Sequence, residues 1–220
     1  MGLLGDMWDG ITDAVSSAID VVKRVAPVVG KVIVDNAEKL LTIATMNMHP
    51  LAKIVTAVAT ILGVLMKDEN VEEIGAKAMM SDKKAEDFES YNDYIEYLRN
   101  DVTLDKEKFD NATEAEKLAR AAIGSTLAIK AINEKLDQDI PFEAWVALAK
   151  AGIEGKEAIS IFKDFKGSIS EFVDFVNGEL TPKKEIEVGD KLAENLKAQN
   201  PHMSEQDIDK RIIEMSIQKD

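Results

Sequence analysis

The sequence predicts an all-α protein: a multi-helix bundle with long antiparallel helices and an apolar N-terminal helical hairpin. Two observations support this prediction. Apolar residues recur at alternating spacings of three and four along several long stretches, which places them on one face of a helix and not on one face of a strand. No run alternates apolar and polar side chains long enough to indicate a strand. With 220 residues, the chain is long enough to bury a core without cross-links.

Charge is distributed unevenly along the chain. Of the 41 acidic and 27 basic residues, six acidic and five basic ones lie in residues 1–66, which leaves 35 and 22 in residues 67–220. The first third is therefore apolar and nearly neutral, at −1, and the remainder is acidic, at −13, within a total of −14. We interpret residues 1–66 as an apolar and amphipathic helical segment and residues 67–220 as an acidic helical bundle.

The N-terminus carries acidic residues where a secretory signal carries basic ones, so we expect no signal peptide. From Ile11 a helical period predicts an amphipathic helix that ends or kinks at Pro27, and a second amphipathic stretch follows it. A soluble form is expected, and export by a route without a signal peptide and association with a membrane are both compatible with it. The sequence leaves the location unknown.

The most apolar run is Ile54–Met66, thirteen residues without a charge. A membrane-crossing helix needs about 20 such residues, whereas a run of about 10 to 14 is more typical of a core helix or of an interfacial or re-entrant segment. Small residues four apart, such as Ala59 and Gly63, permit close helix contact both in lipid and in a protein core. We expect Gly63 at such a contact, because glycine inside a helix costs about 0.5 to 1 kcal/mol relative to alanine.

Beyond residue 67 the spacing predicts bundle helices with narrow apolar seams. The seams cover 88–102, 118–136 and 158–176, and each alternates by three and four as in a coiled coil. The last seam continues past Gly167, so we expect one long helix there, bent at the glycine.

Capping residues mark several helix ends. A capping box, in which two residues three apart satisfy each other's backbone amides, precedes the second seam. Prolines are well placed as first residues of helices, where their missing N–H has no partner in any case. These expected caps and starts are Thr113 with Glu116, Pro141, Thr181 with Pro182, and Ser204.

The side chains that most enzymes use are scarce. The chain has no cysteine and two histidines, and neither His49 nor His202 has a second ligand type at the spacing of a zinc or di-iron site. The twelve glycines form no nucleotide-binding pattern, and no Gly-x-Ser-x-Gly turn presents a nucleophile. We therefore predict a protein that is not an enzyme, with no catalytic residue, cofactor or metal. The net charge argues against a nucleic-acid partner.

Two hypotheses for function are compatible with this pattern. The first is a non-enzymatic, membrane-active helical protein, such as a pore-forming toxin, secreted effector or penetration protein, that shields apolar N-terminal helices in a soluble acidic bundle. The second is a structural or adaptor protein whose apolar N-terminal third is the interface of a larger assembly, for example a virion or a secretion particle. The apolar third followed by an acidic remainder favours the first.

Both hypotheses place the contact with a lipid membrane or a protein partner in residues 1–66, and both are compatible with a homo-oligomer. The contact residues are expected on the amphipathic stripe and in the apolar run. They are Trp8, Ile11, Val15, Val22, Ile54, Val58, Ile61, Leu62, Gly63 and Leu65.

Overall fold

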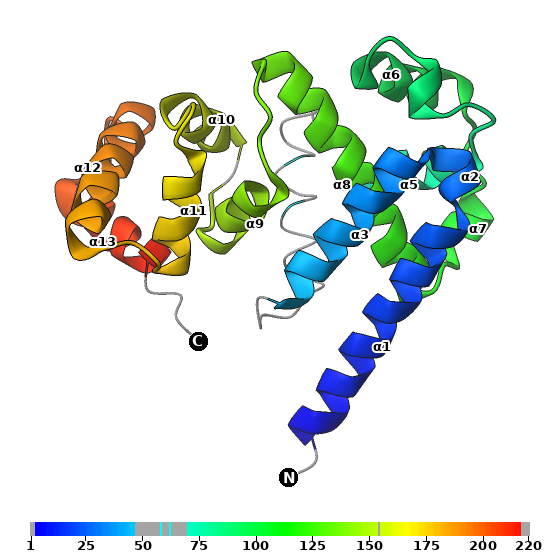
Figure 1. Ribbon diagram of the computed structural model, residues 1–220, viewed down its shortest axis with the longest axis horizontal. Helices are drawn as coiled ribbons and strands as arrows, with labels where there is room; N and C mark the ends of the chain where they lie inside the picture. The colour runs from blue at the N-terminus through cyan, green and yellow to red at the C-terminus, as the bar shows by residue number, and fades with distance from the viewer. Residues whose placement is uncertain (1–2, 47–57, 59–61, 63–69, 154, 217–220) are drawn as a thin grey trace. The chain divides into compact units, whose positions relative to one another are not determined.

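The computed structural model describes residues 3–46, 58, 62, 70–153 and 155–216, and for 3–12, 44–46 and 156 it describes the backbone only. These residues form twelve α-helices and no strand, which confirms the predicted all-α class (Figure 1). The chain divides into two compact units, Met1–Asp139 (unit 1) and Ile140–Asp220 (unit 2).

Unit 1 holds α1 (Leu3–Arg24), α2 (Ala26–Val29), α3 (Lys31–Met46), α5 (Val71–Met80), the 3₁₀ helix η1 (Ala85–Asp87), α6 (Tyr91–Asp101), α7 (Lys106–Asp110) and α8 (Glu114–Leu136). Unit 2 holds α9 (Phe142–Lys150), α10 (Gly155–Asp164), α11 (Ile169–Asn177), α12 (Pro182–Gln199) and α13 (Glu205–Ser216).

Helix α8 is the centre of the described part of unit 1. The predicted capping box starts it: the Glu116 amide donates to Thr113 Oγ1 at 3.3 Å, and the Thr113 amide donates to the Glu116 carboxylate at 2.8 Å. Every residue from Ala122 to Ile129 is buried. The predicted narrow seam over 118–136 is therefore wrong in width, because α1, α3, α5 and α6 pack around α8 and cover several of its sides.

The helices α5 and α8 touch backbone to backbone. A Cβ atom built on Gly75 would lie 1.9 Å from the carbonyl oxygen of Arg120, and one built on Gly124 would lie 1.8 Å from that of Val71. Real Cβ atoms do not approach that closely, so only glycine fits at either position. The pair allows the two helix axes to approach as they do at small-residue contacts in membranes.

The N-terminal hairpin, which we define as α1 to α3, has α1 and α3 side by side in unit 1 (Figure 1). Its first helix begins at Leu3 and not at Ile11 as the period suggested, because glycine weakens a helix without ending it, so the helix continues through Gly5 and Gly10. The helix ends at Arg24, before Pro27, in agreement with the prediction. Between α2 and α3 the backbone reverses at Gly30, whose φ is +90°.

Unit 2 has an aromatic core. The rings of Trp145 and Phe162 meet edge to face with centroids 4.7 Å apart, and those of Phe165 and Phe172 lie 6.0 Å apart. The prediction of one helix over 158–176 is wrong: α10 ends at Asp164 and α11 begins at Ile169. Between them Gly167 has φ +82°, a left-handed conformation that stops a helix.

The predicted starts of α9, α12 and α13 agree with the structure within one residue, whereas that of α6 does not. Thr181 is the N-cap residue of α12, without a capping hydrogen bond from its side chain, and Pro182 follows in the first turn. Ser204 Oγ accepts from the Asp207 amide at 3.1 Å at the start of α13. Pro141 is the capping residue of α9 and not its first helical residue. Similarly, α6 begins at Tyr91, so the first part of the predicted 88–102 seam precedes the helix.

The structural division lies elsewhere than the change in composition. The units separate at residue 139, whereas the charge changes at residue 67, inside the segment 63–69 that lies outside the described residues. Helices from both sides of residue 67 pack together on α8. The domain boundary proposed from composition stays a prediction.

Candidate functional site

The structure describes the side chains of four of the ten predicted contact residues. Val15 and Val22, on α1, are 4% and 0% exposed, and Val58 and Leu62 are both 0% exposed. Trp8 and Ile11 lie in α1 with only their backbone described. The other four predicted residues lie outside the described residues: Ile54, Ile61, Gly63 and Leu65.

Helices α1 and α3 of the hairpin each bury one apolar row in unit 1. Successive buried residues are three or one apart, as expected for the inner face of an amphipathic helix. The rows consist of Val15, Ala18, Val21 and Val22 in α1 and of Ile33, Val34, Ala37, Leu40 and Leu41 in α3. Contact between these rows and a membrane or partner requires the hairpin to leave α8.

The outer faces of the hairpin are polar. Asp13, Ser16 and Asp20 of α1 are exposed, and Lys23 Nζ lies 3.7 Å from Glu38 of α3, with side chains that are 57% and 28% exposed. An ion pair this exposed contributes about 0 to 1 kcal/mol. Apolar packing is therefore the main stabilisation of the hairpin in unit 1.

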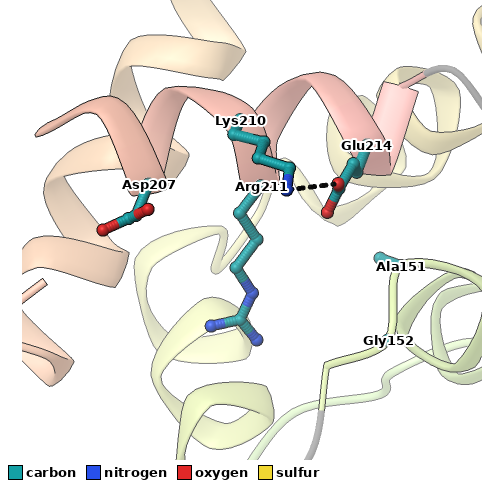
Figure 2. Close-up of a pocket in the computed structure, with 6 residues that line it drawn as sticks. All are labelled: Ala151, Gly152, Asp207, Lys210, Arg211 and Glu214. Atoms are coloured by element: carbon teal, nitrogen blue, oxygen red, sulfur yellow. Dashed lines mark ion pairs between the residues drawn. The ribbon is translucent and has the colours of Figure 1, made fainter. Parts of the chain in front are cut away.

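Unit 2 has a charged pocket of about 450 Å³ beside α13. Figure 2 shows Lys210 and Glu214 paired at its edge, 3.8 Å apart, with Arg211 pointing away from them. Arg211 instead donates two hydrogen bonds to Glu157, at 3.1 and 2.6 Å. Each cation is thus matched by an acid, so the pocket has the character of a structural ion-pair site and not of an anion-binding one.

Burial shifts the pKa values of titrating groups in both units. Burial raises the pKa of Tyr94 to about 12, and burial lowers that of Lys150, whose Nζ donates to Asn177 at 3.1 Å. These two residues lie in different units. Within the described residues, no three side chains of the metal-binding types gather where they could hold an ion.

The fold and these sites together define an all-α protein of two helical units with a sheltered amphipathic hairpin. Comparison of the chain with protein-family models, with curated proteins and with solved structures finds no match. Among the described residues, no helix combines the length and the apolar character required to cross a membrane.

Two exposed apolar residues on unit 2 were not predicted from the sequence. It gave no indication that Ile186 and Ile213 are exposed, at 65% and 52%, although both lie in helices that it predicted. A usable signal was present for Ile186, which is two residues from the buried Val188. Because two residues turn a helix by about 200°, a residue at this distance from a buried one is expected on the opposite, exposed side.

Proposed function

We propose that the chain is a non-enzymatic, membrane-active helical protein that holds the apolar faces of α1 and α3 on α8 and releases them onto a lipid surface. The observation that carries this proposal is the pair of buried apolar rows beneath polar outer faces. Amphipathic helices of this type lie in the bilayer interface with the apolar face toward the acyl chains. Transfer from α8 to lipid exchanges one apolar environment for another, so the rows stay out of water.

The contacts of the hairpin are compatible with such a release. The Lys23–Glu38 ion pair joins α1 to α3, so it moves with the hairpin and does not have to break. The main cost is the apolar surface of α8 that becomes uncovered. Lipid contact of further residues, including the predicted contact Trp8, offsets part of that cost.

Charge sets the expected pH dependence. Residues 67–220 carry −13 of the net charge of −14, so anionic lipid should repel the protein at neutral pH. Carboxylates with ordinary pKa values near 4 begin to take up protons as pH falls from about 7 toward about 5. We expect binding to anionic vesicles to increase over that range.

The start of α8 should stay intact in this range. A hydrogen bond from the Thr113 amide lowers the pKa of Glu116 below 4.5, with the charges of Arg120 and Arg24 acting in the same direction. An acid whose pKa is lowered by folding stabilises the fold above its unfolded value, and the stabilisation is lost as pH falls through the folded value. The capping box therefore persists at about pH 5, and the hairpin is released from a folded α8.

Vesicle flotation tests the proposal, with size-exclusion chromatography of the same samples in parallel. The vesicles are phosphatidylcholine alone or phosphatidylcholine with phosphatidylglycerol. Trp8→Ser should weaken flotation, whereas Val32→Ser, at a position of α3 that is 44% exposed and outside the buried row, should not. Absence of flotation at every pH would contradict the proposal, and stoichiometric oligomers without lipid would support assembly instead.

An adaptor or structural protein is the second candidate. The observation that favours it is an open apolar surface on unit 2, where Ile186 and Ile213 are more than half exposed. An interface through the N-terminal third would require the hairpin to open, as a membrane would. The surface on unit 2 requires no rearrangement.

A further inference from the structure

An apolar groove lies open between α12 and α13 in unit 2. Its volume is about 420 Å³, which is within the range of about 300 to 1,000 Å³ found for ligand pockets. The exposed Ile186 and Ile213 contribute to its lining, one from each helix. Large aliphatic side chains in such a position are usually covered by something, because leaving them in water costs about 25 cal/mol per Å².

Gly189 opens the groove on the α12 side. It lies in the middle of α12, where glycine costs about 1 kcal/mol relative to alanine. Unlike Gly75, it is not required by packing: a Cβ would lie 3.7 Å from Ile212 and 3.8 Å from Phe175, which are ordinary contacts. The missing side chain leaves space that a larger residue would fill.

The charged residues that line the groove are all acidic within the described part of the chain. Glu185 and Asp190 belong to the α12 side, and Asp209 to the α13 side. The basic residues of α13 lie elsewhere, since Lys210 and Arg211 line the separate pocket of Figure 2. The groove therefore presents an apolar strip with negative charge on both walls.

We propose that this groove binds a cationic amphipathic helix of a partner protein. Apolar side chains spaced three and four apart along such a helix would pack on Ile186 and Ile213, and lysine or arginine beside them would meet the acidic walls. The walls disfavour two other occupants: a second copy would bring the same acids face to face, and anionic lipid would be repelled. This inference goes beyond the proposed membrane function, since it concerns a different unit and does not require the hairpin to move.

The test measures binding of a labelled, capped helical peptide to the full-length chain by fluorescence anisotropy. The peptide has leucine at positions i, i+3, i+4 and i+7 of successive turns and lysine at the flanking positions. Gly189→Leu should lower its affinity by about tenfold or more by filling the groove, since a lost contact of about 1.4 kcal/mol corresponds to tenfold. Asp209→Lys should lower the affinity and weaken its dependence on salt.

Control variants and a control peptide distinguish binding in the groove from nonspecific binding. Met80→Ser removes an exposed apolar residue of unit 1, 50% exposed, and should leave the affinity unchanged. A peptide with glutamate in place of lysine should bind at least about tenfold more weakly. Circular dichroism and a thermal melt establish that Gly189→Leu is folded, and Ile213→Ser provides a second groove variant if it is not.

Three outcomes would overturn the proposal. The first is equal binding of the lysine peptide and the glutamate peptide. The second is that the lysine peptide binds the wild-type chain no more tightly than it binds a folded groove variant. The third is that the groove variants abolish self-association of the chain instead of peptide binding. The last outcome would identify a second copy as the occupant. Loss of peptide binding in Gly189→Leu and Asp209→Lys, with Met80→Ser unaffected, is the result we expect.

Discussion

Replacing Gly75 by alanine is expected to destabilise unit 1 by at least about 3 kcal/mol, and Gly124→Ala should have a similar effect. The new methyl group would lie 1.9 Å from the backbone oxygen of Arg120 in the first variant and 1.8 Å from that of Val71 in the second. A backbone atom in a helix cannot rotate away as a flexible side chain can, so α5 and α8 must separate. Urea unfolding monitored by circular dichroism measures the change.

The matched control is Gly189→Ala, also within a helix. Its new Cβ has ordinary contacts at 3.7 and 3.8 Å, so alanine's better helix propensity should stabilise the protein by about 0.5 to 1 kcal/mol. The opposite signs of the two stability changes distinguish a close backbone contact at Gly75 from the general effect of replacing a glycine within a helix. Equal small effects at Gly75 and Gly189 would show that α5 and α8 do not touch as described.

The second large effect is expected in unit 2, where Phe162→Ala should cost about 3 to 5 kcal/mol. Phe162 is fully buried and its ring packs edge to face against Trp145, so truncation removes apolar burial, an aromatic contact and core volume together. Tryptophan fluorescence in a Trp8→Phe background reports on Trp145 and therefore on this core alone.

Hydrogen exchange by mass spectrometry locates both effects. Since the two units have separate cores, Gly75→Ala should accelerate exchange in α5 and α8 while leaving α9 to α13 protected. Phe162→Ala should do the reverse. Exposed Ile186→Ser, at 65% exposure, is the control for Phe162 and should change stability by no more than about 0.5 kcal/mol. Loss of protection across both units in either variant would argue for one cooperative structure.

The sequence predicted the all-α class and most helix ends because these depend on local chemistry. The Thr113 capping box and the Pro182 start are read directly from neighbouring residues, and each is present in the structure. The central role of α8 was not predicted. Its middle is rich in small residues such as Gly124 and Ser125, which contribute little to a hydrophobic period although both are fully buried. Their burial depends on the helices around α8.

The break at Gly167 was missed for a different reason. The apolar spacing of 158–176 continues across it, and a glycine inside such a pattern is compatible both with a bend and with an end. The left-handed φ of +82° depends on how α10 and α11 fold back in unit 2. The groove was equally impossible to predict from the sequence. The exposure of Ile213 depends on which faces of α12 and α13 meet, and tertiary packing determines that.

The most direct test of the membrane proposal uses the two tryptophans of the chain, Trp8 and Trp145. Trp145→Phe leaves Trp8 of α1 as the sole fluorophore, and Trp8→Phe leaves Trp145, which is fully buried in unit 2. Each variant is mixed with anionic vesicles made from ordinary or brominated lipid at about pH 5, where binding is expected to be stronger than at neutral pH. The proposal predicts that brominated lipid quenches Trp8 and leaves Trp145 unchanged. Identical Trp8 emission with both lipids would contradict it.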